Sequence, residues 1–254
     1  MKNLVWFRND LRLHDNPALS QACAKADQVV GIYIVTFKQW EEHNDSPNKI
    51  AFWFRSLIEL QKDLHKLNIP LCILKCDTYD DCPQKILEFA SANEINNLYF
   101  NIEYPVNELK RDEQVQAVLE KMGTSCFSFH DQVIHVPGTL KTKAGTNFSV
   151  YSPFKRCWLA ELDYALLEEH AIPTIKQPVS VNQQDEYDLH SYKQSNINQD
   201  LWPVGEESIQ KMIVNFLDRK GSDYKTDRNF PGLTATSMMS PYINSGVVSS
   251  KWCL

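Results

Sequence analysis

The sequence predicts an α/β protein built on a doubly wound, five-stranded parallel sheet. Short apolar runs rich in Val and Ile recur along the first 130 residues. Segments with helical periodicity separate these runs, and no run of about 18 apolar residues, the length of a membrane-spanning helix, occurs in the chain. Strands that alternate with helices in this way form parallel sheets with helices on both faces, as in Rossmann-like domains.

The strands are expected where near-continuous apolar runs indicate burial on both faces of a sheet. They are residues 2–7, 28–36, 71–75, 97–101 and 125–129. The first begins almost at the amino terminus and is too short and too charged at its end for a signal peptide, so we expect a cytoplasmic protein.

Helices are expected at 47–66, 83–93 and 106–122. Ser46 and Pro47 open the first of them as an N-cap followed by a proline at the first helical position. Apolar residues every three or four positions give this helix one buried face, namely Ile50, Phe54, Leu57, Leu60, Leu64 and Leu67. The same reasoning gives 106–122 a buried stripe of Val106, Leu109, Val115, Val118 and Leu119.

After residue 130 the pattern changes, and three regions are expected: an α/β domain at 1–130, a connecting region at 131–204 and a helical region at 205–254. The connecting region contains a loop at 131–150, an amphipathic helix at 151–170 and a polar linker at 173–203. Helices are expected at 205–219 and within 236–254. The chain ends on KWCL without a capping glycine, which suggests a helical domain that is cut short.

Composition narrows the function classes. Hydrophobic residues make up 43% and charged residues 23% of the 254 positions, as in ordinary globular proteins. The net charge of −6 argues against a protein that coats nucleic acid without specificity. The seven cysteines are irregularly spaced, and Cys72, Cys76 and Cys82 have no nearby histidine or CxxC pair to complete a zinc site. No metal site is predicted.

The loop after the first strand has two interpretations. Arg8, Asp10, Arg12 and Asp15 place four charges within eight residues. They form either a rigid ion-paired platform at a domain interface or a solvated loop with weak surface pairs. The same loop contains no glycine, which argues against a nucleotide-binding protein of the universal-stress or electron-transfer-flavoprotein type.

Five segments, spread in order along the chain, resemble the DNA photolyase and cryptochrome family, and specifically bacterial cyclobutane-pyrimidine-dimer photolyases that carry a folate antenna. They are VWFRNDLRLHDNPAL at 5–19, QWEEHNDSP at 39–47, FNIEYPVNELKRD at 100–112, YSPFKRCW at 151–158 and DYKTDRNFPGLTATSMMSPYINSGVVS at 223–249. The resemblance implies an antenna domain followed by the start of an all-α FAD-binding domain.

The resemblance also implies site residues. FAD is expected to contact Tyr224, Thr236, Ser237, Met238, Met239 and Ser240, where hydroxyls and backbone N–H groups before a helix suit a diphosphate. Met238 departs from the family pattern, which commonly has arginine there. The antenna, 5,10-methenyltetrahydrofolate, is expected at His43, Asn107 and Glu108, and Arg228 is expected to face DNA.

The implied activity is light-driven repair of cyclobutane pyrimidine dimers in DNA by electron transfer from reduced FAD. The implied enzyme class is a deoxyribodipyrimidine photo-lyase, monomeric and without a membrane partner. The resemblance places the catalytic region beyond residue 254, so no catalytic residue is expected within the chain. Two alternatives remain open, a non-catalytic antenna-domain remnant and a cryptochrome-like blue-light receptor. In a chain made alone, the apolar side chains of Met212, Val214, Phe216 and Leu217 are expected to lack partners and 205–254 to be mobile.

Overall fold

A computed structural model of the chain describes residues 1–182, 186–192 and 198–254. It confirms the predicted sheet, whose five parallel strands lie in the order β3-β2-β1-β4-β5. The strands are β1 (Lys2–Phe7), β2 (Gln28–Thr36), β3 (Leu71–Cys76), β4 (Asn97–Asn101) and β5 (Ser125–Phe129). Because β1 has β2 on one side and β4 on the other, the chain reverses its direction of winding between β1 and β4.

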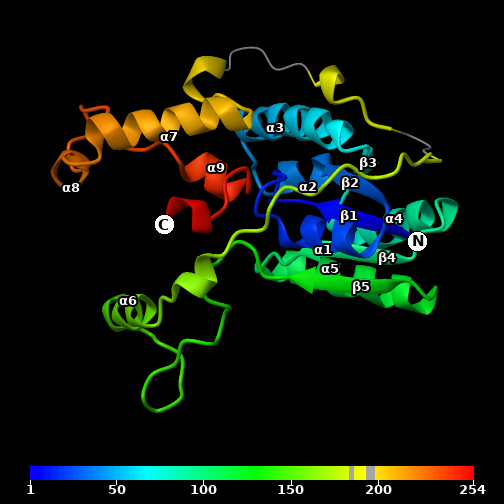
Figure 1. The fold of residues 1–254 in the computed structure, drawn as a ribbon, viewed down its shortest axis with the longest axis horizontal. Helices are drawn as coiled ribbons and strands as arrows, with labels where there is room; N and C mark the ends of the chain where they lie inside the picture. Colours follow the sequence, from blue (N-terminus) through cyan, green and yellow to red (C-terminus); the bar gives the residue numbers. More distant parts are fainter. Residues whose placement is uncertain (183–185, 193–197) are drawn as a thin grey trace.

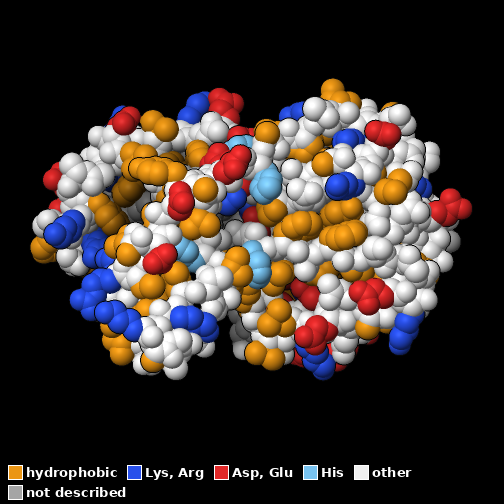
Figure 2. Space-filling model, turned by 60° about the horizontal axis from the view of Figure 1, so that its bottom comes forward, with side chains coloured by type: hydrophobic (Ala, Val, Ile, Leu, Met, Phe, Trp, Pro, Cys, Tyr) orange, Lys and Arg blue, Asp and Glu red, His pale blue; other side chains and the backbone are white. Residues whose placement is uncertain are grey.

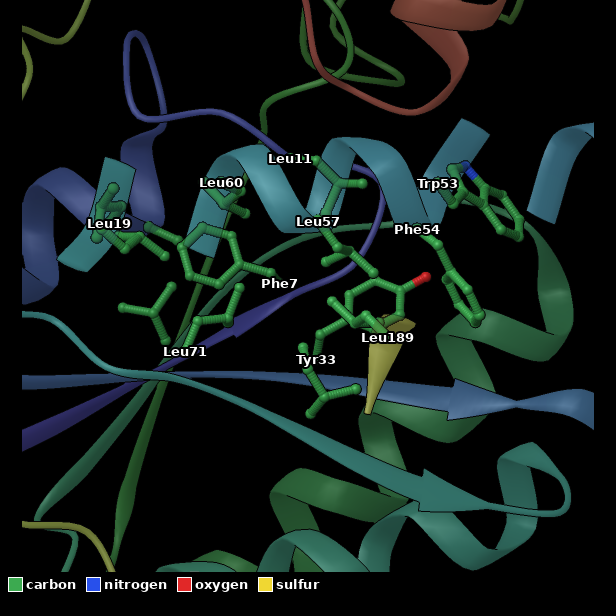
Figure 3. Packing of buried hydrophobic residues seen from close by; sticks show 14 of the residues in the cluster. Phe7, Leu11, Leu19, Tyr33, Trp53, Phe54, Leu57, Leu60, Leu71 and Leu189 are labelled. Carbon is green, nitrogen blue, oxygen red and sulfur yellow. The ribbon is translucent and has the colours of Figure 1, made fainter. Parts of the chain in front are cut away.

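Helices cover both faces of this sheet (Figure 1). Helices α1 (Pro17–Lys25) and α3 (Pro47–Lys66) pack on one face, and α4 (Cys82–Ala92) and α5 (Val106–Lys121) pack on the other. The predicted stripe of α3 is confirmed: Leu57 and Leu64 are fully buried and Ser46 caps the helix through the N–H of Lys49. Figure 3 shows Phe7 and Tyr33 of the sheet packed against this face of α3.

Two predictions about the α/β region were wrong. Helix α5 and the burial of its Val115 and Leu119 are confirmed, but Val106 and Leu109 are 80% and 39% exposed, because the helix turns Arg111 and Asp112 inward instead. Strand β5 is an edge strand with no fully buried side chain, although the other four strands are buried. Helix α1 and the short α2 (Phe37–Glu42) were not predicted, although Asn16 and Pro17 form the same cap-and-proline signal as Ser46 and Pro47.

The rest of the chain consists of short elements. They are α6 (Tyr151–Ala160), α7 (Glu206–Lys220), α8 (Tyr224–Asp227), α9 (Ser240–Asn244) and single 3-10 turns at Tyr164–Leu167, Leu189–Ser191, Gln199–Leu201 and Lys251–Cys253; one further 3-10 turn, Tyr79–Asp81, lies before α4 in the α/β region. The predicted helix at 151–170 thus ends at Ala160, and none of its side chains is buried. The predicted polar linker at 173–203 lies partly outside the described residues.

The C-terminal elements pack on the α3 side of the sheet (Figure 1). Ile209 of α7 and Tyr242 of α9 are buried, and the Tyr242 ring meets the Phe52 ring edge-on at 5.1 Å. Met212 also packs against this core, whereas Val214 and Leu217 are 55% and 60% exposed. The expectation that 205–254 lacks apolar partners is therefore wrong for the inner face of α7 and right for its outer face.

The space-filling surface divides into two lobes (Figure 2). A hollow separates the lobe of the sheet from the lobe that holds the elements at the left of Figure 1, and histidine side chains lie near this hollow. Large apolar side chains around α6 are exposed, including Tyr151 and Leu159. No helix in the described part of the chain is long and apolar enough to cross a membrane.

Candidate functional site

The loop after β1 is a buried, ion-paired platform. Arg8, Asp10, Arg12 and Asp15 are 7%, 2%, 8% and 1% exposed, so the interpretation as a solvated loop is wrong. Burial raises the pKa of Asp10 to about 6, against the opposing effect of the Arg8 guanidinium. Sequence reasoning could not choose between the two interpretations, since the partners of these charges lie more than 90 positions away.

An ion-pair network occupies the sheet edge where the winding reverses. Arg8 donates to the carboxylate of Asp112 at 3.2 Å and to the main-chain oxygen of Asn101, at the end of β4. Arg111 donates to Glu103 at 2.7 Å and to Asp112 at 2.8 Å. Burial opposes ionisation of Glu103, but Arg111 and Arg8 hold the pKa of this carboxyl below its usual range. The network therefore consists of charges that neutralise one another within the protein.

A small cavity lies beside this network, outside the carboxyl ends of the strands. Ligands of doubly wound sheets bind at this edge. Here the volume is only about 40 Å³, because Trp40 and Trp53 pack against each other at 5.5 Å and fill the space. A volume of this kind has room for ordered water, which needs about 10–15 Å³ per molecule.

The three residues assigned to the antenna do not line this small cavity, although Glu108 bonds to Tyr79, which does. His43 follows α2, and Asn107 and Glu108 lie in the first turn of α5. His43 and Asn107 are exposed and Glu108 is half-buried. Hydrogen bonds connect His43 to Glu108 through two intermediates, whereas no side-chain hydrogen bond of Asn107 is found among the described residues.

Gln39 and Tyr79 are those intermediates, and sequence reasoning missed both. Gln39 Oε1 accepts from the backbone N–H of Tyr79 at 3.2 Å, and the Tyr79 hydroxyl donates to Glu108 at 3.4 Å. The Gln39 amide nitrogen must then face His43 Nε2, 2.7 Å away. An amide nitrogen only donates, so His43 Nε2 accepts and the ring proton is on Nδ1. The i, i+4 spacing of Gln39 and His43 was the available sequence signal.

Three of the six residues assigned to FAD line a second, larger cavity. Thr236, Ser237 and Met238 line a space of about 520 Å³ between α7 and the chain that follows α8. Lys220 and Arg228 line the same space and Asp200 is the single acidic residue among its described walls, which leaves a net charge of +1. Hydroxyl groups beside two cations suit a phosphate group.

The other FAD candidates lie outside these walls. Met239 is 9% exposed and belongs to the core beside α3, and Ser240 is the first residue of α9. Tyr224 packs edge-on against Phe216 at 5.7 Å and under the guanidinium of Arg228 at 5.5 Å. Tyr224 thus lies behind two wall residues of the cavity, Phe216 and Arg228.

Met238, which replaces the arginine common in the family, is held in a left-handed backbone conformation with φ of 59°. Its thioether accepts from the Thr236 hydroxyl at 3.6 Å, and its side chain is 42% exposed. Two positively charged side chains, Lys220 and Arg228, line the same cavity as Met238.

The platform after β1 joins the α/β domain to the segment that follows the residues assigned to FAD. Arg12 donates to the Gly246 carbonyl at 2.9 Å. Asp15 accepts from the Ser249 hydroxyl and lies 3.1 Å from Lys251 Nζ. Burial opposes ionisation of Asp15, but Ser249 and the other donors around it hold its pKa below the usual range.

The described residues contain no group of three or more His, Cys, Asp or Glu side chains placed to hold a metal ion. Cys72, Cys76 and Cys82 are free and buried. Burial raises the pKa of the Cys72 thiol to about 12. A thiol with so high a pKa stays protonated near neutral pH, so we interpret Cys72 as a structural cysteine.

Comparison with known proteins gives a consistent result. The family model described as DNA photolyase matches residues 3–177. The deoxyribodipyrimidine photo-lyase of Buchnera aphidicola from Acyrthosiphon pisum is 36% identical over 258 residues, which cover 100% of this chain and 52% of that protein. The chain thus spans about half the length of the curated relatives it matches.

Solved structures agree. A bacterial class III photolyase from Agrobacterium tumefaciens superposes with a TM-score of 0.83 at 26% identity, over 98% of this chain and 51% of that one. A cryptochrome from Synechocystis gives a TM-score of 0.84 at 19% identity over 99% of this chain and 54% of that one, which is a likeness of fold alone. Sequence and structure together show that this chain belongs to the DNA photolyase family.

Proposed function

We propose that this chain acts in the light-driven repair of cyclobutane pyrimidine dimers in DNA, and that it binds the diphosphate of reduced FAD and a folate antenna. The relatives named deoxyribodipyrimidine photo-lyase support the reaction class. The observation that carries the proposal is the 520 Å³ cavity lined by Thr236, Ser237 and Met238. In this proposal the protein is a cytoplasmic monomer whose partner is damaged DNA.

The cavity residues bind and orient. Two hydroxyls donate hydrogen bonds to phosphate oxygens, and Lys220 and Arg228 neutralise their charge. The exposed guanidinium of Arg228 is also the group that we propose for contact with a DNA phosphate. Reduced flavin, when bound, supplies the electron that splits the dimer.

The antenna would lie across His43, Asn107 and Glu108. In the tautomer fixed by Gln39, His43 presents an Nδ1–H donor, while Glu108 presents carboxylate acceptors. A pterin edge carries both donors and acceptors and is complementary to this pair.

Binding of FAD and riboflavin to the same chain tests the phosphate grip. Riboflavin lacks both phosphates, so FAD should bind at least about tenfold more tightly, a difference of about 1.4 kcal/mol. Arg228→Gln should weaken FAD binding and leave riboflavin binding unchanged. Arg219→Gln, on the same helix as Lys220 but outside the cavity walls, is the matched control. Equal affinity for the two flavins would refute the proposed site.

A further inference from the structure

A third cavity, distinct from the two candidate cofactor sites, lies where the C-terminal elements meet the α/β domain. It has a volume of about 240 Å³ and is bounded by the loop after β1, α3, the start of α7 and the chain at 247–252. Its inner walls are apolar: Leu11, Leu60, Ile209 and Val248 are each 5% exposed or less. An occupant must therefore have an apolar body.

Most side-chain hydrogen-bond donors in the walls are already engaged, although the indole N–H of Trp252, which also lines the cavity, has no hydrogen-bond partner among the described residues. Arg12 donates through all three of its side-chain nitrogens to main-chain carbonyls. The Ser56 hydroxyl donates to a carbonyl of its own helix at 2.9 Å, and the Ser249 hydroxyl donates to a carboxylate. These walls offer little to an anion, since a bound anion would need free donors.

The acceptors in the walls are only partly engaged. Lys62 Nζ lies 2.8 Å from one oxygen of Glu59, and Lys66 Nζ lies 2.6 Å from one oxygen of Asp63. Both lysines are highly exposed and lie outside the walls. The second oxygen of each carboxylate has no hydrogen-bond partner among the described residues, so both remain available as acceptors.

The start of α7 adds a third carboxylate. Glu206 accepts from the Gln210 side chain through one oxygen, at 3.1 Å. His14, on the opposite wall, has its Nε2 3.3 Å from Glu169 and so faces a carboxylate of its own. The polar part of the cavity is consequently acceptor-rich and negatively charged.

We infer that this cavity binds a small organic cation, a protonated amine carried on an apolar body. The ammonium group would donate to the free oxygens of Glu59 and Asp63, and the apolar body would lie against Leu60, Ile209 and Val248. An apolar wall alone would accept any small hydrophobe, and exposed carboxylates alone would hold only a hydrated ion. Their meeting in one partly open cavity selects a molecule with both features.

The test compares 2-phenylethylammonium with 2-phenylethanol, which has a similar shape and no charge. Each is titrated into the full chain while the methyl resonances of Ile209 and Val248 are followed by NMR. The ammonium compound should shift both methyl groups saturably and bind about tenfold more tightly than the alcohol. Equal binding, or shifts that do not involve these methyl groups, would overturn the inference.

Variants separate a direct contact from a general charge effect. Glu59→Gln combined with Asp63→Asn removes both charges and leaves one acceptor oxygen on each side chain, so affinity for the amine should fall about tenfold towards that of the alcohol. Alcohol binding should remain unchanged, which shows that the cavity is still folded. Glu113→Gln combined with Glu120→Gln, on the distant α5, changes the net charge equally and should have no effect; an equal loss there would overturn the inference.

A final arm distinguishes a free amine from a lysine side chain of a partner protein. Nα-acetyl-lysine amide presents the same ammonium group on a peptide backbone. The free amine should bind more tightly, because its apolar body fits the inner walls. Tighter binding of the lysine derivative would overturn the assignment to a small free amine.

Discussion

The guanidinium of Arg12 donates to the carbonyl oxygen of Gly246 at 2.9 Å, although 234 positions separate the two residues. Beside this bond, the Leu11 N–H donates to the Ser245 carbonyl at 3.4 Å. The loop after the first strand therefore holds the end of the chain against the α/β domain. This contact also fixes the position of the proposed FAD cavity relative to the proposed antenna residues.

Gly246 should be intolerant of any side chain. Its φ is 64°, and a Cβ atom would overlap the carbonyl group of Asn9. Gly246→Ala should lower the free energy of unfolding by about 3 kcal/mol, measured by urea denaturation. Gly145→Ala is the matched control, since Gly145 has φ of 77° but open space around it. Equal losses in the two variants would contradict the role of the close contact.

The buried network around Arg111 should depend on both charges of a pair. Arg111→Met leaves Glu103 and Asp112 buried without their main partner, so the free energy of unfolding should fall by about 3–5 kcal/mol. Adding Glu103→Gln to Arg111→Met should restore part of that loss. A double variant less stable than Arg111→Met alone would contradict this account of the network.

Asp10 should make stability fall as the pH rises from about 4 to about 6. Its folded pKa, about 6, lies above the usual value near 3.8, so the folded protein holds this proton more tightly than the unfolded chain does. The contribution is complete below the unfolded pKa and is lost as the pH passes the folded pKa. Asp10→Asn should remove this slope from the unfolding free energy, whatever its effect on overall stability. Asp218→Asn, on the exposed face of α7, should leave the slope intact.

Gln39 should set the tautomer of His43. Nitrogen-15 NMR of the histidine ring should show the proton on Nδ1 in the unchanged protein. Gln39→Glu replaces the donor that faces Nε2 with an acceptor and should move the proton to Nε2. Gln84→Glu, on α4, is the control because Gln84 bonds only to Glu88 among the described residues. An unchanged His43 spectrum in Gln39→Glu would show that this hydrogen bond is absent.

Local pattern was enough to predict the sheet and α3. Buried strands need continuous apolar runs, and a long helix on a sheet needs one apolar stripe, so each element carries its own signal. Helix α5 carried such a signal only in part: its position and the burial of Val115 and Leu119 were predicted, but Arg111 and Asp112 also face inward. Charged residues are normally exposed, and only their partners on other elements make their burial favourable.

Sequence reasoning identified single residues of the candidate sites, but not which of them lie together. Motif resemblance named His43 and Glu108, but it gave no role to Gln39, which lies in the segment 39–47, and Tyr79 lies outside all five segments. In the same way, resemblance named Thr236 and left out Lys220, which shares its cavity. Contacts between elements that are distant in the sequence decide which of these residues line the same cavity. Such contacts leave no periodic pattern in the sequence, so sequence reasoning could not find them.

The most direct test of the proposed function is the absorbance spectrum of the purified chain after incubation with FAD and 5,10-methenyltetrahydrofolate and removal of free cofactor. The account predicts that the flavin and pterin bands are both retained, and that Arg228→Gln selectively reduces the flavin band. A spectrum with neither band would contradict it. Retention of the pterin band alone would contradict the FAD cavity and leave an antenna protein.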